Sequence, residues 1–584
     1  MARDEVPRLT PKSQEKGHDM TTDYTVGCYL IDRLRELGVH HLFGVPGDFA
    51  FPFLNLVEQT QGLQWTGNCN ELNAAYAADG YAQAGERAGA FVVTAAVGEL
   101  SASCGIAGSY AEHVPTVCIA GYPGTDEMAQ KTYTHHSFNG GDFSPVPRMM
   151  TEITTDSAVL TPEDPCEVID RILQACWREK LPVYMCFPRD VQKMVVAPPA
   201  TKLDLSDPAS DPTQLNAFAD AAADIVGGAQ RPAILVDTNT GRFHFTAAVQ
   251  DFADAAGLPF AVTSGGKTAF VDESHPNYVG LYLGQTGDQA ATSAIQEADV
   301  LLRFCLTHSE LLDRFGSPDS HPCTTIDFQP TSVTVGGKTY TDVSLRDALS
   351  ALQARITKRS NAITSLRSTL RREPFVPAPG TALTHDRLWD AIADLVAADD
   401  VICLEQATSM VGLHMPLPAR GKVLFQQCWS AIGGTLPTMV GAMIAAPHLR
   451  HIMIAGDGAF QVTAQELSTI VRLGLAPIII LQHNDVYAVE NTTNERGYGD
   501  MAYNDLQPWH YENLPDLFDG NDRGNVRGIR AATEEELARA LEDAATTQNQ
   551  GICTLIVVPV PKDEVPTQLK NDMAVYGANT GRWK

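Results

Sequence analysis

The residues best suited to chemistry in this chain lie between His451 and Glu490, in the sequence HIMIAGDGAFQVTAQELSTIVRLGLAPIIILQHNDVYAVE. Asp457 stands in a Gly-Asp-Gly turn after one apolar run, and Asn484 follows a second apolar run 27 positions later. Carboxylate and amide oxygens suit Mg²⁺, which keeps few protein ligands and commonly bridges them to phosphate groups. The pair therefore predicts a site for magnesium and a phosphate-bearing ligand.

The elements that must position this pair are two strands joined by a helix. The apolar runs have strand length, and the residues between them have helical spacing, at Leu467, Ile470, Val471 and Leu475. The carboxyl ends of parallel strands share one edge of a sheet, where α/β proteins bind ligands. Gly458 lets the backbone approach a ligand closely, and the start of the following helix favours a phosphate.

Three further groups could carry protons, although each has an ordinary explanation. Glu71 begins an alanine-rich helical pattern, where a carboxylate often only complements the helix dipole. His135 and His136 form a pair in a polar segment without a third ligand at zinc spacing. Asp48 ends the string FGVPGD, and Glu490 lies one helical turn after the predicted metal loop. None of these residues is specific by itself.

Taken together, the strings resemble the thiamine-diphosphate-dependent enzymes, in particular the pyruvate, indolepyruvate and branched-chain 2-oxo acid decarboxylases. The resemblance covers about residues 22–565. It rests on GDG with HND, FGVPGD at 43–48, ELNAAYAADGYA at 71–82, the histidine pair followed by GDF at 141–143, WSAIG at 429–433 and YAVE at 487–490.

The resemblance implies a cofactor site of thiamine diphosphate and Mg²⁺. The metal ligands would be Asp457, Asn484 and the carbonyl oxygen of Val486, and the cofactor contacts Glu71, Gln406, Ser430, Ile432, Asp457, Gly458, Ala459 and Asn484. The chain departs from the family pattern at His483, which replaces an asparagine, and at Val486, which replaces a glycine. The second departure leaves the conformation of the turn open.

The same resemblance assigns catalytic roles. Glu71 would face the pyrimidine ring and activate it, as a carboxyl with a raised pKa in an apolar pocket can do. Ile432 would wedge between the two rings of the cofactor, unless it is an ordinary core residue. Asp48, His136 and Glu490 would supply protons, and His135 would orient its neighbours. The reaction would pass through an ylid and an enamine and release an aldehyde.

The substrate is less sharply indicated. The string LEQATS at 404–409 is closer to the indolepyruvate and branched-chain branch than to strict pyruvate enzymes. The pocket would be formed by Gln406, Met410, Val489 and Thr493, and strict pyruvate enzymes carry bulkier walls at the last three of these positions. Smaller or more flexible walls leave room for a larger acyl group, so we expect broad specificity.

Composition narrows the classes of partner and compartment. The chain has 42 basic and 70 acidic residues, a net charge of −28, which repels nucleic acid and anionic lipid. It has no apolar run long enough to span a membrane, and its first residues lack the apolar core of a signal peptide. Its 12 cysteines are scattered without a CxxC motif, as expected of structural thiols in a reducing cytoplasm.

Alternating helical and strand patterns predict an α/β fold with three Rossmann-like, doubly wound parallel-sheet domains, as in the thiamine-diphosphate-binding fold. Two proline-rich linkers separate them. We expect a disordered tail at 1–21, an N-terminal pyrimidine-binding domain at 22–196, a central domain at 213–357, a C-terminal diphosphate and magnesium domain at 380–565, and a tail at 566–584.

The sequence also bears on three other functions, a thiamine-dependent carboligase or oxidase, a non-catalytic scaffold and a dehydrogenase. A carboligase resembling acetolactate synthase, or a flavin-dependent oxidase, generally lacks the histidine pair at 135–136. A non-catalytic scaffold would have little reason to retain Glu71, Asp457 and Glu490 together. An NAD-dependent dehydrogenase would need a glycine fingerprint that is missing. The resemblance also implies a homodimer or homotetramer, with each cofactor between two subunits.

Overall fold

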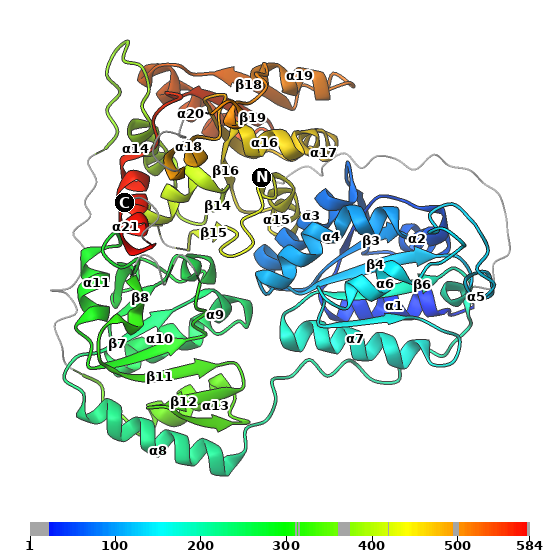
Figure 1. Ribbon diagram of the computed structural model, residues 1–584, viewed down its shortest axis with the longest axis horizontal. Coiled ribbons are helices and arrows are strands. Elements are labelled where there is room, and N and C mark those ends of the chain that lie inside the picture. The colour runs from blue at the N-terminus through cyan, green and yellow to red at the C-terminus, as the bar shows by residue number, and fades with distance from the viewer. Residues whose placement is uncertain are drawn as a thin grey trace, which may run out of the picture.

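The chain folds into three α/β units, each built around its own sheet, as the computed structural model in Figure 1 shows. The structure describes residues 23–309, 312, 316–359, 374–418, 420–494 and 501–580. The tail expected at 1–21 lies outside the described residues. Among the described residues, no helix is both long and apolar enough to cross a membrane.

The first sheet is wholly parallel, with strand order β2-β1-β3-β4-β6-β5. Its strands are β1 (His41–Gly44), β2 (Gln64–Gly67), β3 (Gly89–Thr94), β4 (Thr116–Tyr122), β5 (Asp156–Val159) and β6 (Val183–Pro188). Helices α1 (Val26–Glu36), α2 (Phe51–Gln59) and α7 (Pro165–Glu179) cover one face, and α3 (Glu71–Gly85), α4 (Val97–Ala111) and α6 (Pro145–Met150) cover the other. The remaining elements are the short helices η1 (Asp48–Ala50), α5 (Thr125–Ala129) and η2 (Val191–Lys193).

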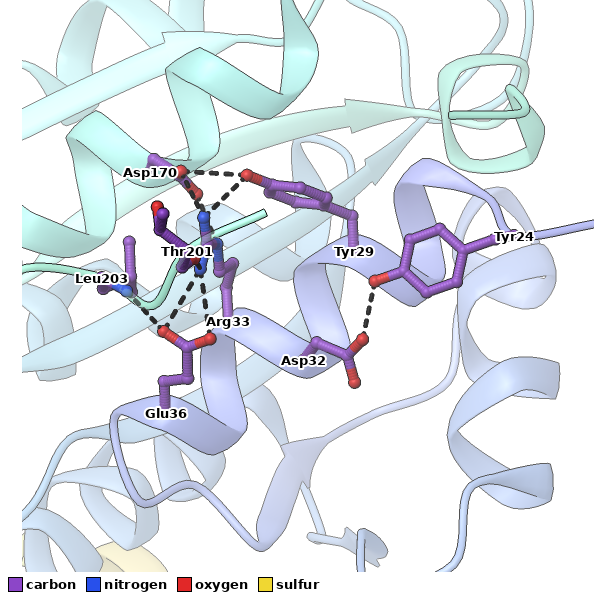
Figure 2. A network of polar contacts seen from close by, with 8 residues as sticks. All are labelled: Tyr24, Tyr29, Asp32, Arg33, Glu36, Asp170, Thr201 and Leu203. Carbon is purple, nitrogen blue, oxygen red and sulfur yellow. Dashed lines mark hydrogen bonds and ion pairs between the residues drawn. The ribbon is translucent and has the colours of Figure 1, made fainter. Parts of the chain in front are cut away.

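A buried arginine ties this unit together (Figure 2). The guanidinium of Arg33, on α1, donates two 2.7 Å hydrogen bonds to Asp170 on α7 and one to the carbonyl oxygen of Thr201. Glu36 accepts from the N–H of Leu203 at 2.6 Å. Because a buried charge must be paired, this network fixes the start of the first linker against α1 and α7.

The central sheet has strand order β13-β12-β11-β10-β7-β8-β9. Its strands are β7 (Pro232–Val236), β8 (Phe260–Val262), β9 (Tyr278–Leu281), β10 (Val300–Phe304), β11 (Thr324–Gln329), β12 (Ser332–Val335) and β13 (Lys338–Thr341). Its helices are α8 (Pro212–Gly228), α9 (Thr238–Arg242), η3 (Gly265–Ala269), α10 (Thr246–Ala256), α11 (Gln289–Gln296), η4 (Pro318–Ser320) and α13 (Leu345–Gln353). The sheet is not wholly parallel as expected, because Gly336 and Gly337, with φ of 55° and 87°, allow the tight turn of an antiparallel hairpin.

The third sheet is again parallel, with order β15-β14-β16-β17-β19-β18. Its strands are β14 (Val401–Leu404), β15 (Lys422–Leu424), β16 (His451–Gly456), β17 (Ile478–His483), β18 (Val526–Arg530) and β19 (Cys553–Pro559). Two apolar clusters join helices to this sheet. The first involves α14 (His385–Leu395), η6 (Ala407–His414) and α20 (Glu534–Gln548), and the second involves α15 (Thr435–Ala445), α17 (Leu467–Leu473) and α19 (Leu514–Phe518). The crossover expected as one helix is divided into α16 (Asp457–Thr463), η7 (Ala464–Glu466) and α17. Short helices α18 (Ala488–Thr493), η8 (Ala502–Asn504) and η9 (Tyr511–Asn513) follow β17.

Helices α3 and α15 join the first and third units, which lie side by side in Figure 1. The two helices are in backbone contact. A Cβ atom added to Gly441 would lie 1.8 Å from the carbonyl oxygen of Ala77, and one added to Gly80 would lie 1.9 Å from that of Thr438. Only glycine fits at these two positions, so the small residues set how closely the two units approach.

The end of the chain forms a helix, α21 (Thr567–Thr580), within the tail expected at 566–584. Asp572 on this helix lies with Oδ2 3.1 Å from Nε2 of His414, at the end of η6. Gln568 donates to the carbonyl oxygen of Thr286 in the central unit at 3.3 Å. The helix therefore contacts both the central and the third unit, as the red ribbon in Figure 1 shows.

Candidate active site

Asp457 begins α16 directly after β16, and the residue is 1% exposed. Its Oδ1 accepts from the N–H of Gly458 at 2.9 Å, and its Oδ2 accepts from the N–H groups of Asn484 and Asp485 at 3.0 and 2.7 Å. Burial raises the pKa of this carboxyl above its ordinary value, although the three backbone donors oppose the rise. The two turns predicted to meet at the edge of the sheet are thus in contact.

The turn after β17 carries the other predicted metal ligands. Asn484 Oδ1 accepts from the N–H of Val486 at 3.3 Å. The left-handed residue of the turn is Asp485, with φ of 58°, whereas Val486 does not have a positive φ. The valine that replaces a family glycine therefore creates no left-handed strain.

A second set of possible metal donors lies at the same place. Ligand atoms of Asp457, His483 and Asp485 lie within 4.8 Å of one another. Nε2 of His483 lies 3.0 Å from Oδ1 of Asp485, so these two side chains already engage each other. Mg²⁺ prefers oxygen to imidazole nitrogen, so the chemistry of the donor atoms favours the predicted set of Asp457, Asn484 and Val486 over the set that includes His483.

The predicted cofactor contacts Gly458 and Ala459 lie in the first turn of α16. A Cβ atom on Gly458 would lie 2.6 Å from Cε1 of Tyr487, so the ring leaves room only for glycine. Ala459 is 8% exposed, and its carbonyl oxygen would lie 3.1 Å from a Cβ atom on Gly433. The start of α16 is therefore packed against the turn that carries Ile432.

That turn is held by two hydrogen bonds of Gly433. Its N–H donates to Oε2 of the buried Glu405 at 3.2 Å, and its carbonyl oxygen accepts from Thr463 at 2.6 Å. Ser430 is exposed and left-handed, with φ of 51°. Ile432 is 40% exposed, so it is not an ordinary core isoleucine.

The predicted pocket residues lie on two neighbouring helices. Gln406 is buried at the start of η6, and its Nε2 donates to the carbonyl oxygen of Gln426 at 3.1 Å. Met410 on η6 and Val489 on α18 pack half-buried against the same apolar cluster, and the two helices are in contact. Thr493 ends α18, but its side chain lies outside the described part.

The first sheet gathers a separate group of polar side chains. Asp48 begins η1 after β1, and its Oδ1 lies 3.1 Å from Nε2 of His135. The ring of His135 stacks on Phe49, with centroids 4.7 Å apart. Burial opposes ionisation of Asp48, but the hydrogen bond and charge interaction with His135 outweigh it, so the pKa of Asp48 lies below its ordinary value.

His136 lies beside this pair, with its ring centroid 4.6 Å from that of His135. Its Nδ1 lies 3.2 Å from Oγ1 of Thr94, the last residue of β3. Burial and the neighbouring His135 lower the pKa of His136 below its ordinary value, and the charges of Asp48 and Glu71 oppose this. The lowered pKa therefore favours the neutral imidazole.

Glu71 begins α3, where the side chain of Asn70 caps the helix by accepting from the N–H of Asn73. A Cβ atom on Gly98 would lie 3.3 Å from Oε1 of Glu71, so this carboxylate lies against the start of α4. Glu71 and the histidine pair thus share the carboxyl edge of the first sheet.

Hydrogen bonds around Glu71 join this edge to the third unit. Glu466, in η7, accepts from Nδ2 of Asn68 at 2.7 Å and from Nδ2 of Asn73 at 2.6 Å. It also accepts from the N–H of Cys69 at 3.2 Å. The start of α3 is therefore fixed to the segment that follows the turn at Asp457.

Glu490 lies on α18, which follows the turn at Asn484, and its side chain is exposed.

Models of three domains of one family match this chain. They are the N-terminal TPP binding domain over residues 24–142, the central domain over 219–354 and the C-terminal TPP binding domain over 406–558 of the thiamine pyrophosphate enzymes. The chain belongs to the thiamine pyrophosphate enzyme family. Asp48, Glu71 and the histidine pair fall within the N-terminal match, and the turns at Asp457 and Asn484 fall within the C-terminal match.

Relatives of this thiamine pyrophosphate enzyme extend along nearly the whole chain. It is 35% identical over 549 residues to an alpha-keto-acid decarboxylase of Mycobacterium leprae, covering 94% of each chain. It is 36% identical over 553 residues to one of Mycolicibacterium paratuberculosis, covering 94% and 95%. A solved structure of a candidate thiamin diphosphate-dependent enzyme from Mycobacterium smegmatis matches 92% of this chain and 100% of its own, with TM-score 0.74 and 20% identity, which supports the fold.

Three residues of the site had no prediction from the sequence. Thr94 contacts His136, Glu466 joins the two units, and Glu405 holds the turn of Ile432. Thr94 and Glu405 each lie at the carboxyl end of a strand, a position that could have singled them out. Glu466 lies within a helical pattern, and no local signal distinguishes it.

Proposed function

We propose that this thiamine pyrophosphate enzyme decarboxylates a 2-oxo acid without oxidation and releases the aldehyde and carbon dioxide. The observation that carries the proposal is the cluster of Asp48, His135 and His136 beside Glu71. The names of the relatives, alpha-keto-acid decarboxylase, support the same reaction. When bound, thiamine diphosphate supplies the electron sink for cleavage of the carbon–carbon bond.

Residues at the carboxyl edge of the first sheet would accept and donate the protons of the reaction. Glu71 would face the pyrimidine ring of the cofactor and exchange a proton with it. The lowered pKa of His136 favours its neutral form, which can accept a proton and return it. Asp48, whose lowered pKa favours the ionised form, would accept and return protons alongside His136, and it holds the ring of His135 through the 3.1 Å contact. Glu490, on α18 of the third unit, would supply protons as well.

The residues of the third sheet would hold the cofactor and the metal. Mg²⁺ would be bound by Asp457, Asn484 and the carbonyl oxygen of Val486. Ile432, which projects from its turn with 40% of its surface exposed, would support the cofactor between its two rings. The remaining cofactor contacts are Glu71, Gln406, Ser430, Gly458 and Ala459.

The substrate would be a broad range of 2-oxo acids, with branched or aromatic acyl groups accepted alongside pyruvate. Met410 is flexible and Val489 is small, and both lie at the rim of one apolar cluster. Gln406 would contact the polar end of the substrate, and Thr493 would complete the wall. A preference for pyruvate of about tenfold or more in kcat/KM would contradict this proposal.

A homodimer, alone or within a homotetramer, would complete the site. Apolar side chains are exposed along α4 and near the cofactor turn: Val97 at 53%, Leu100 at 44%, Trp429 at 37%, Ile432 at 40% and Val462 at 44%. Exposed apolar patches of this kind mark association surfaces. Leu100→Asp should shift the protein to a smaller species in size-exclusion chromatography with light scattering. An unchanged mass would contradict this interface.

The cytoplasm is the proposed compartment. All 12 cysteines are free, and several are buried in strands, among them Cys118, Cys186 and Cys403. Free thiols on this scale fit a reducing environment. The acidic surface makes nucleic acid and anionic membrane unsuitable partners.

The test is to strip the purified protein with a chelator and supply pyruvate, phenylpyruvate and 4-methyl-2-oxopentanoate in turn. Aldehyde is followed with and without thiamine diphosphate and Mg²⁺, and Glu71→Gln serves as the control. Aldehyde that needs both cofactors and is lost in the variant supports the proposal. Acetolactate or peroxide from pyruvate, without aldehyde, would instead assign a carboligase or an oxidase.

A further inference from the structure

The turn between β3 and α4 touches both proton-carrying groups of the first sheet. Thr94, at the start of this turn, has Oγ1 3.2 Å from Nδ1 of His136. Gly98, just after it, lies against the carboxylate of Glu71. The position of the turn therefore determines how these two groups are supported.

Ala96, in the middle of the turn, has a backbone conformation that L-residues rarely adopt, with φ of 53° and ψ of −76°. Glycine would adopt it without crowding, but alanine carries a Cβ atom. Such residues persist only where the surrounding structure holds them in place. The turn thus needs an external support.

One side chain provides that support. Glu99 is 0% exposed, and its Oε2 accepts from the N–H of Ala96 at 2.6 Å. Oε2 also accepts from the hydroxyl of Tyr122 at 2.8 Å, and Oε1 accepts from the hydroxyl of Tyr184. These tyrosines lie on β4 and β6, at the centre of the sheet, so Glu99 connects the strained turn to the rigid core.

Burial of this carboxyl is itself unfavourable. Desolvation raises the pKa of Glu99 to about 7, even though Tyr184, Tyr122 and Ala96 all donate to it. An apolar side chain would fill the same volume without that penalty, but it could not accept from the N–H of Ala96. The buried carboxylate thus serves two sets of donors, the N–H of Ala96 and the two tyrosine hydroxyls.

We propose that Glu99 is a positioning residue for decarboxylation, which acts by holding Ala96 and thereby placing the turn Thr94–Val97 against His136 and Glu71. The inference rests on the proposed function. It assigns Glu99 no contact with substrate or cofactor. The competing explanation is that Glu99 only satisfies two buried tyrosines, and Ala96→Gly separates the two, because glycine relieves the strained turn and leaves the tyrosines unchanged.

The test compares Glu99→Ala, Glu99→Gln and Ala96→Gly/Glu99→Ala with the wild-type enzyme. Three quantities are measured: kcat at saturating thiamine diphosphate and Mg²⁺, the melting temperature, and the rate at which diethylpyrocarbonate modifies His136 without cofactor, followed by mass spectrometry. Asp170→Asn is the control, because it breaks a polar contact of the same unit on the opposite face of the sheet.

We expect Glu99→Ala to lower kcat by about 100-fold, the effect of displacing a catalytic group by ~1 Å, and to speed modification of His136. Glu99→Gln should stay within about threefold of the wild type, since its amide oxygen still accepts from Ala96. Ala96→Gly/Glu99→Ala should recover at least about tenfold in kcat. Asp170→Asn should lower the melting temperature with little change in kcat.

An unchanged kcat in Glu99→Ala, or a loss that Ala96→Gly does not restore, would overturn the proposal. If Glu99→Ala does not fold, Glu99→Asp takes its place, because its side chain is one methylene shorter and its carboxylate is withdrawn from the N–H of Ala96. Loss with Glu99→Asp and recovery with Ala96→Gly/Glu99→Asp would support the proposal, and full activity of Glu99→Asp would overturn it. Absence of aldehyde from the wild type would defeat the proposed function, and the modification rate of His136 would still test Glu99.

Discussion

Nε2 of His135 lies 3.1 Å from Oδ1 of Asp48, although 87 residues separate them in the chain. The sheet brings Asp48 to its carboxyl edge at the end of β1, and stacking on Phe49 orients the imidazole. The two side chains are 47% and 53% exposed, so the contact is open to small molecules. A polar contact this exposed adds little to stability, so we infer a chemical rather than a structural role for it.

The first prediction concerns Asp48→Asn. We expect kcat to fall by about 100-fold, the usual contribution of an acid–base group, with the melting temperature nearly unchanged. The charge of Asp48 raises the pKa of His136, so removing it should lower that pKa further. His136 would then stay neutral to lower pH, and the acidic limb of the kcat/KM profile should move to lower pH.

The matched control is Asp126→Asn, an exposed carboxylate on α5 of the same unit. It should leave both kcat and the acidic limb in place. Movement of the acidic limb of the kcat/KM profile to higher pH in Asp48→Asn would contradict the prediction.

The contact between Asp48 and His135 also has a pH-dependent effect on stability. Because the pKa of Asp48 is depressed, any stability from this contact is present above the ordinary aspartate range and is lost as pH falls through the depressed value.

The sequence was sufficient for the elements that rest on local patterns. The apolar run at 478–481 predicted β17, which extends to His483, and the alanine-rich string predicted α3 from Glu71 onward. The crossover after Asp457 was expected as one helix, but it is interrupted by η7, where Glu466 binds Asn68 and Asn73. A contact between residues about 390 positions apart leaves no local signal.

The candidate site likewise includes contacts that the sequence predicts and contacts that it does not. The meeting of Asp457 with the turn at Asn484 follows from a single crossover, and the structure has it. The contact of Thr94 with His136 depends on how a long polar segment returns to the sheet, which periodicity does not encode. The antiparallel hairpin in the central sheet was not predicted, although Gly336 and Gly337 could have indicated it, because paired glycines favour tight antiparallel turns.

The second prediction distinguishes the two sets of metal donors. If Asp457, Asn484 and Val486 bind Mg²⁺, Asn484→Ala should raise the Mg²⁺ concentration for half-maximal activity by about 10- to 100-fold. His483→Asn should change it by less than about threefold, because the imidazole is not a ligand. Calorimetric titration of Mg²⁺ in the presence of thiamine diphosphate checks the same order without relying on turnover. The opposite order would assign the metal to Asp457, His483 and Asp485.

The third prediction concerns the pocket wall at Val489. Val489→Ile adds one methylene to a side chain that packs on the same apolar cluster as Met410, so it should disfavour phenylpyruvate relative to pyruvate by about tenfold in kcat/KM. Both substrates are measured on the same enzyme preparation, so that errors in active concentration cancel. Val195→Ile, at a position 63% exposed, is the control and should leave the ratio unchanged. An unaltered ratio in Val489→Ile would remove this residue from the pocket.

The fourth prediction concerns the joint between the first and third units. Gly441→Ala places a Cβ atom 1.8 Å from the carbonyl oxygen of Ala77, so α15 and α3 must separate. Overpacking of this kind lowers the free energy of unfolding by about 1–3 kcal/mol. Because α3 begins at Glu71 and is joined to Glu466 through Asn73, kcat should fall as well. Thermal melting and aldehyde formation measure the two effects.

Gly227→Ala is the matched control for this substitution. Gly227 lies in α8, and a Cβ atom there would have no heavy atom within 4 Å. Alanine stabilises a helix by about 0.5–1 kcal/mol relative to glycine, so this variant should melt slightly higher and keep its activity. The same chemical change should thus have opposite effects on stability at the two positions, because only Gly441 faces another backbone. Equal melting temperatures for the two variants would mean that α3 and α15 do not meet this closely.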